Sequence, residues 1–121
     1  MMFEAEPDTT YLVEIMGAYQ SVINTTGLAL VLDIPSGSVI GQAVAVVTGT
    51  TPGMIEQFAD GVSSGATPAT RAPNSNTALS ARYLVNVGSA GGPVQLMFRS
   101  EIAGSAITIK AHLTVMGMRK I

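Results

Sequence analysis

The sequence has 121 residues, a formal net charge of −2 and no cysteine. That length suits one domain with a single hydrophobic core and is too short for a multidomain enzyme. Six Lys and Arg residues, spread along the chain, exclude the clustered basic surface that binding to nucleic acid requires, and the missing cysteines exclude a disulfide framework and thiolate chemistry.

The surface is expected to be unusually neutral. Charged residues make up 12% of the chain, against roughly 25% in a typical soluble domain. Gly, Ala, Ser and Thr take their place, and a neutral surface on a small free monomer tends to associate. We therefore expect much of this surface to be covered by other protein.

The chain begins with MMFEAEPDTT, residues 1–10, which is acidic and lacks the charged-then-apolar pattern of a signal peptide. No stretch approaches 18 consecutive apolar residues, so we expect no transmembrane helix and no membrane partner. The protein is expected to be made in the cytoplasm and used without Sec export. Residues 1–10 are predicted to form an N-terminal arm, and residues 11–121 a single domain.

Four strand-like runs follow the arm. Their β-branched residues and their Gly and Pro boundaries favour strands over helices. They cover residues 11–16, 19–25, 28–35 and 38–49. Gly17 and Ala18 are predicted to form a turn between the first two.

Residues 49–78 differ from the rest of the chain, because they are rich in Gly, Pro, Ser, Thr, Asn and Ala and few of them alternate. Within this segment, PGMIEQFADG has apolar residues at helical spacing and Gly61 at a C-terminal stop, which predicts one short helix. The remainder is predicted to be a long surface loop. Loops of this length are uncommon in compact domains and are usually functional or disordered, so this one could wrap around a neighbour.

Alternation of apolar and polar residues returns after residue 78. One face is formed by Ala81, Tyr83, Val85 and Val87, the next by Val94, Leu96 and Phe98, and the last by Ile107, Ile109, Ala111, Leu113 and Val115. Turns between these runs predict a C-terminal meander of three antiparallel strands. Seven or eight strands with little helix predict an all-β antiparallel sandwich.

Three patterns could carry chemistry, and each has a simpler interpretation. GVSSG, around Ser63, matches the nucleophile elbow of hydrolases, but that motif needs a strand-to-helix turn in a parallel sheet. His112, the single histidine, lacks the convergent N, O and S donors of a metal site. Arg99 and Glu101 are expected to form an exposed ion pair. We expect no enzymatic activity and no cofactor.

The C-terminal residues 94–121, VQLMFRSEIAGSAITIKAHLTVMGMRKI, resemble the C-terminal signature of small phage-encoded structural proteins. In that signature an FRSE-aGS-vTIkA run leads into a last strand of alternating residues. The resemblance implies a jelly roll similar to the tumour necrosis factor and complement-head sandwiches, which commonly assemble as trimers. One departure is that His112 and Leu113 directly follow Ala111, where the family often has Gly-Ser, which predicts a straighter last strand.

The resemblance implies a role in the virion. The leading hypothesis is a capsid decoration (cement) protein, a homotrimer on the capsid exterior that binds the major capsid protein and stabilises the assembled head. The alternative is a receptor- or glycan-binding head domain of a phage fibre. The absence of Trp, with three Tyr and three Phe, disfavours that alternative.

Two groups of residues are predicted to make the contacts. The even-numbered side of residues 106–116 is the predicted subunit interface: Thr108, Lys110, His112, Thr114 and Met116. If three copies of His112 meet there, trimer stability is expected to fall as the pH drops through the imidazole range, because like charges accumulate. The arm and the long loop are the predicted capsid contact, through Met1, Met2, Phe3, Glu4, Glu6, Arg71 and Asn74. Both segments are expected to order on binding, and the alternative is that they are simply disordered.

Overall fold

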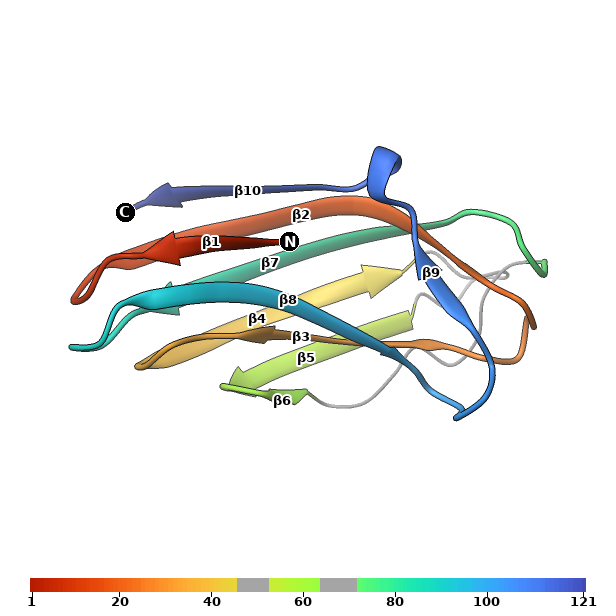
Figure 1. Cartoon of the computed structure of the whole chain (residues 1–121), viewed down its shortest axis with the longest axis horizontal. Helices are drawn as coiled ribbons and strands as arrows, with labels where there is room; N and C mark the ends of the chain where they lie inside the picture. The colour runs from red at the N-terminus through yellow and green to blue at the C-terminus, as the bar shows by residue number, and fades with distance from the viewer. Residues whose placement is uncertain (46–52, 64–71) are drawn as a thin grey trace.

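The computed structural model describes residues 1–45, 53–63 and 72–121. Most of these residues lie in antiparallel strands that form two facing sheets (Figure 1). The predicted all-β antiparallel sandwich is confirmed. The predicted strand over residues 28–35 is present, as are the described part of 38–49 and the strand over 79–87.

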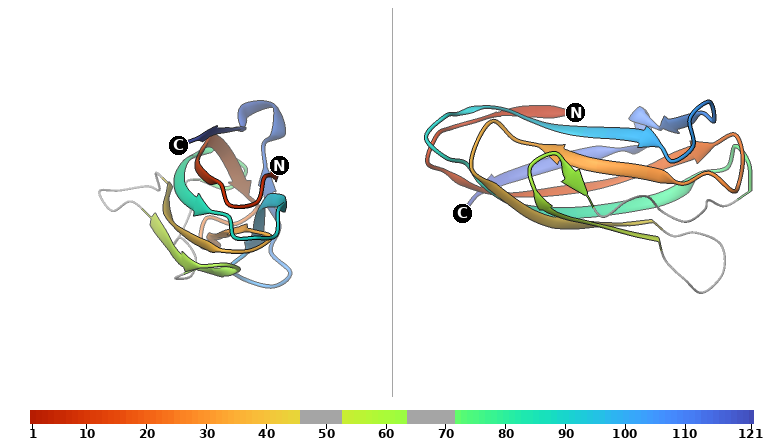
Figure 2. Two further views of the ribbon diagram at one scale, coloured as in Figure 1. Left: turned by 90° about the vertical axis from the view of Figure 1, so that its left-hand side faces the viewer. Right: turned by 90° about the horizontal axis from the view of Figure 1, so that it is seen from below.

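The larger sheet has seven strands in the order β10-β2-β7-β4-β5-β6, and β9 pairs with β2 beside β10. Their bounds are β2 Thr10–Ser21, β4 Ser38–Ala45, β5 Gly53–Ala59, β6 Val62–Ser63, β7 Thr77–Asn86, β9 Ile107–Ile109 and β10 Val115–Lys120. The end-on view in Figure 2 shows the structure curling around its long axis rather than forming two flat layers.

The smaller sheet has three strands in the order β1-β8-β3, namely Met2–Ala5, Gly92–Ser100 and Leu28–Asp33. Residues 2–5 of the predicted N-terminal segment or arm therefore form part of the sandwich, because they pair with residues 92–95 of β8. Their side chains explain this docking. Ala5 is buried, and the ring of Phe3 meets that of Tyr11 edge to face at 5.2 Å.

Alternation along the strands builds the core. β7 alternates strictly between buried and exposed residues, which confirms the predicted inward face containing Ala81, Tyr83 and Val85. Three tyrosines, Tyr11, Tyr19 and Tyr83, are among the largest fully buried side chains. Burial raises the pKa of Tyr83 to about 12, because the phenolate would lose its hydration.

The predicted turn at Gly17 and Ala18 is wrong, because β2 runs unbroken through both residues. β7 pairs with β2 from Thr10 to Tyr19, so the ladder continues where the sequence suggested a break. Glycine is needed at position 17 for a different reason. A Cβ on Gly17 would lie 2.4 Å from the Thr114 side chain, so the close approach of this neighbouring segment requires glycine.

The predicted helix around Met54 to Ala59 is also wrong, since these residues form β5. Ile55 and Gln57 are buried while Met54, Glu56 and Phe58 are exposed, a period of two that pairing with β4 imposes. Two strands thus lie within the predicted 49–78 loop, and β7 begins at residue 77. Residues 46–52 and 64–71 lie outside the described part of the chain.

The predicted C-terminal meander is wrong as well. β7 pairs with β2 and β4 in the larger sheet, whereas β8 pairs with β1 and β3 in the smaller one. The chain after β7 therefore crosses between sheets instead of closing a hairpin. β9 and β10 then return to the larger sheet and pair with β2.

Side chains rather than a strand ladder join the two sheets between β5 and β3. The Leu32 N–H donates to Gln57 Oε1 at 2.7 Å, and Gln57 Nε2 donates to the Leu32 carbonyl at 2.6 Å. Nearby, the Ile34 N–H donates to Asp60 Oδ1 at 2.8 Å. These amide and carboxylate groups satisfy backbone groups on the edge of β3 that would otherwise be buried without partners.

Candidate assembly surface

The outer face of the larger sheet carries large apolar side chains that water can reach. Six of them are between 42% and 67% exposed: Met16, Ile40, Met54, Phe58, Leu84 and Val115. They come from five neighbouring strands, β10, β2, β7, β4 and β5. We call this surface the outer face. Exposed apolar side chains gathered on one face of a sheet are typical of sites of protein contact.

The pairing registers arrange this surface in rows that cross the strands. One mainly apolar row contains Leu12, Leu84 and Ile40 and ends at Arg119 of β10, and a second contains Val115, Met16, Ser80, Val44 and Met54. Between them runs a polar row of Gly117, Glu14, Arg82, Gln42 and Glu56. Within it, Arg82 Nε lies 3.3 Å from Glu14 Oε1, in an exposed ion pair that contributes little stability.

Residues 106–116 were predicted to form a single strand, but at the edge of the sheet beside β2 this strand is interrupted. β9 ends at Ile109, a 3₁₀ turn (η1) follows at Ala111–Leu113, and β10 begins at Val115. Residues 110–114 stand opposite only Gly17 and Ala18, so the chain bulges away from the sheet.

Thr114 anchors the bulge to the sheet. Its hydroxyl donates to the Lys110 carbonyl at 2.8 Å and accepts from the Ala18 N–H at 3.3 Å. The Lys110 N–H donates to the Ala18 carbonyl at 2.9 Å, so both ends of the bulge are tied to β2. The predicted straight last strand is therefore wrong.

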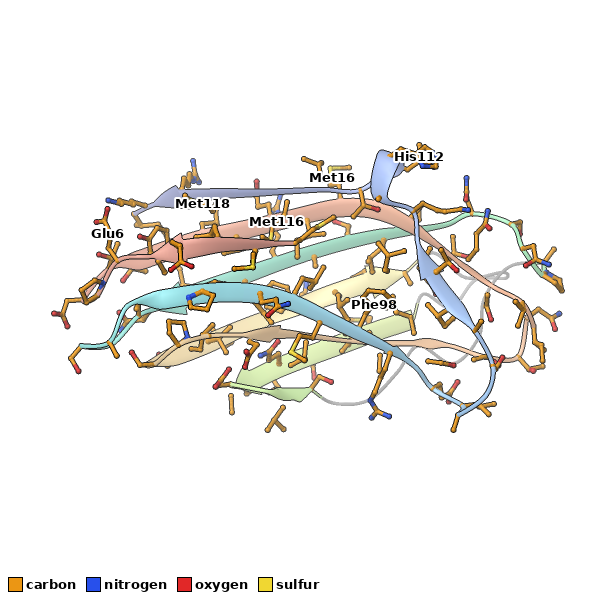
Figure 3. The ribbon with its side chains drawn as sticks, in the orientation of Figure 1. Glu6, Met16, Phe98, His112, Met116 and Met118 are labelled. Atoms are coloured by element: carbon orange, nitrogen blue, oxygen red, sulfur yellow. The ribbon has the colours of Figure 1, made fainter. Side chains whose placement is uncertain are left out.

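The five predicted interface residues do not share one face. Thr108 and His112 are exposed, whereas Lys110, Thr114 and Met116 are partly buried, and Met116 packs against the core. On the predicted core side, Leu113 and Val115 are 47% and 65% exposed. His112 projects from the sheet edge on the 3₁₀ turn (Figure 3). The strand face on which three copies of His112 were expected to meet is therefore not formed.

The predicted capsid-contact residues are also separated. Met1, Met2, Glu4 and Glu6 are exposed in or beside β1, whose C-terminal end lies next to the start of β2, and Phe3 is partly buried there. The Asn74 N–H donates to the Ser21 carbonyl at the other end of β2, which is about 35 Å away for a strand of this length. Arg71 lies outside the described residues.

Glu6 binds the C-terminal strand rather than standing free. Lys120 Nζ donates to Glu6 Oε2 at 2.6 Å, and this hydrogen bond raises the pKa of the Lys120 ammonium. Glu101 was predicted to form an ion pair with Arg99. In the structure, Glu101 Oε2 accepts a hydrogen bond from the Gly27 N–H at 2.9 Å.

A groove of about 410 Å³ lies between β3, β6 and β8. Its lining includes Val31, Val62, Met97 and Phe98, with Arg99 and Ser63 as polar groups. Ser63 belongs to strand β6, which hairpins antiparallel with β5, so it does not stand on the strand-to-helix turn of a nucleophile elbow.

The described residues contain no group of three or more His, Cys, Asp or Glu side chains that could hold a metal ion. Among the described segments, no helix has the length and apolar character needed to cross a membrane.

The sequence did not predict the outer face, in part because Met54 and Phe58 of β5 were assigned to a helix. The signal that could have found it is the apolar character of both sides of several strands, such as Met16 beside Ile15 and Ile40 beside Val39. Comparison of the chain with protein-family models, with curated proteins and with solved structures gives no match.

Proposed function

We propose that this protein is a non-enzymatic structural protein of a phage virion. In this proposal it is a decoration protein that forms a homotrimer on the capsid exterior and binds the assembled major capsid protein. The observation that carries the assembly part of the proposal is the apolar outer face. The virion role itself rests on the resemblance of residues 94–121 to phage structural proteins.

Burial of the outer face would contribute to an assembly contact. Burying the exposed half of each of its six large apolar side chains yields about 1 kcal/mol per residue. The ion pair of Arg82 with Glu14 adds polar specificity in the middle of that surface. A ligand that binds only the assembled shell stabilises it by mass action, which is the physical task of a decoration protein.

The groove supports the second candidate, a fibre head domain that binds a receptor or a glycan. Phe98 lines this groove and is 48% exposed, and an exposed aromatic ring suits stacking on a sugar. A fibre head domain that binds through this groove would not need a second copy of the chain on the outer face.

Native mass measurement tests the assembly, and the expected species is a trimer. Met16→Glu places a charge on the outer face and should no longer form the trimer, with unchanged circular dichroism. Ser89→Glu, on an exposed connection away from that face, is the matched control and should stay trimeric. A wild-type monomer at micromolar concentration would contradict the assembly part of the proposal.

Rebinding then separates the two candidate functions. Capsids stripped of the protein should rebind it at many copies and melt at a higher temperature, whereas host cells should not bind it. Binding to cells or to glycans without binding to shells would favour the fibre head and contradict the decoration role.

A further inference from the structure

The second surface of interest is the open edge of β10, the last strand of the larger sheet. The Ile121 N–H donates to the Thr10 carbonyl at 3.0 Å, in the same register that pairs Val115 with Met16. In an antiparallel ladder, hydrogen-bonded residues alternate with residues whose backbone groups point the other way. The backbone N–H and C=O groups of Met116, Met118 and Lys120 therefore point away from β2.

This edge has some features that discourage strand addition, since it is short and carries Arg119 and Lys120, but its backbone geometry permits it. β10 stands at the end of the sheet order, so no described strand pairs with its outer side. Its six residues contain no proline, and its register with β2 is continuous. Lysine on an edge discourages pairing, but Lys120 is held by Glu6. Met118 is 48% exposed, so the edge is accessible.

We propose that β10 pairs with β10 of a second copy of this chain, antiparallel and centred on Met118. In that register Met118 faces its own symmetry mate, and Met116 faces Lys120 of the other copy. Each of these pairs is hydrogen-bonded, so all three outward-pointing residues of each copy find partners. A register centred on Gly117 would pair Met116 with Met118 of the other copy but place Lys120 opposite residue 114, outside β10, so it would form fewer hydrogen bonds.

The side chains are compatible with this register. Arg119 stands opposite Gly117 of the second copy, and Lys120 opposite Met116, so no two like charges face each other directly. A two-fold axis makes the contact isologous. The two larger sheets become one, and their outer faces become continuous across the axis. The proposal does not depend on the virion role, and it holds for a dimer or for trimers joined in pairs.

Cysteine cross-linking tests the register, because the natural chain has no cysteine. In Met118→Cys, the two introduced thiols lie on a hydrogen-bonded pair whose Cα atoms are about 5.5 Å apart, within disulfide range. Val115→Cys is the matched control on the same strand. Its two copies would lie about 20 Å apart, because residue 115 faces residue 121 of the other copy.

Under mild oxidation, the Met118→Cys protein should form a covalent dimer and the Val115→Cys protein should stay uncross-linked. Equal cross-linking of both variants, or none of the Met118→Cys protein at concentrations where the wild type associates, would overturn the proposal.

Amide hydrogen exchange provides a second test that needs no substitution. The amides of Met116, Met118 and Lys120 should exchange freely in dilute protein and become protected as the concentration rises, while those of Gly117 and Arg119 stay protected throughout. Protection of the even-numbered amides that appears only when capsid shells are added would show that the shell takes this edge, and would refute pairing between copies.

Met118→Pro removes the N–H groups of the central pair and leaves the bonds to β2 intact, since proline is tolerated on an outward-pointing edge position. The two-fold contact should weaken at least about tenfold. Met118→Ala keeps both N–H groups and should associate nearly as the wild type does. If Met118→Pro associates as tightly as Met118→Ala, the backbone pairing is wrong.

Discussion

Gln57 offers a sharp test of how the two sheets are joined. Its side chain is 1% exposed and makes hydrogen bonds of 2.7 and 2.6 Å to the backbone of Leu32, which is itself buried. In Gln57→Met a side chain of similar size fills the space without hydrogen-bonding. The N–H and C=O of Leu32 are then buried without partners, at about 1–3 kcal/mol each. The expected loss of unfolding free energy is about 4 kcal/mol.

Urea unfolding followed by circular dichroism measures this loss at one fixed protein concentration. A loss of about 4 kcal/mol is a large part of the 5–15 kcal/mol that typically stabilises a domain. The urea concentration at the unfolding midpoint should therefore fall clearly, while the dependence of the unfolding free energy on urea concentration stays the same. Gln42→Met, on the exposed side of neighbouring β4, is the control and should change stability by less than about 0.5 kcal/mol. If both variants unfold at the wild-type midpoint, the Gln57 bridge does not hold the sheets together.

Two further predictions concern the bulge and the core. Gly17→Ala should destabilise the protein by about 1–3 kcal/mol, because its Cβ would meet Thr114 at 2.4 Å. In a Thr114→Gly background the same change should cost much less, and additive effects in thermal unfolding would contradict the contact. Burial raises the pKa of Tyr83 to about 12 from 10.0, so the folded protein keeps a proton that the unfolded chain releases. This contribution to stability is complete below pH 10 and is lost as the pH rises to 12, by roughly 3 kcal/mol. Tyr83→Phe should flatten that fall in urea titrations between pH 9 and 12, and an equally steep fall would refute the assignment.

Some of the fold could be predicted because it depends on local alternation. The inward face of β7, with Ala81, Tyr83 and Val85, follows directly from a period of two. The errors arose where partners distant in the sequence decide the structure. Residues 53–59 have helical spacing of apolar groups, yet pairing with β4 makes them a strand. Gly17 looked like a turn residue, but it is small because Thr114 packs over it.

The same difference between local signals and long-range pairing applies to the candidate surfaces. The predicted interface on residues 106–116 assumed one straight strand, and no local signal shows that residues 110–114 bulge where β2 offers only two opposing residues. The outer face could have been anticipated from strands that are apolar on both sides. The open edge of β10 could not, because the order of strands in a sheet depends on pairing across the whole chain.

Composition and side-chain alternation were enough to predict the class of structure: a surface with few charges, and strands with an apolar inner side. Which strands became neighbours could be seen only in the folded chain, because backbone hydrogen bonds join residues far apart in the sequence without regard to side-chain identity. That pairing assembled Met16, Ile40, Leu84 and Val115 into one exposed face and left the backbone of Met118 at an open edge.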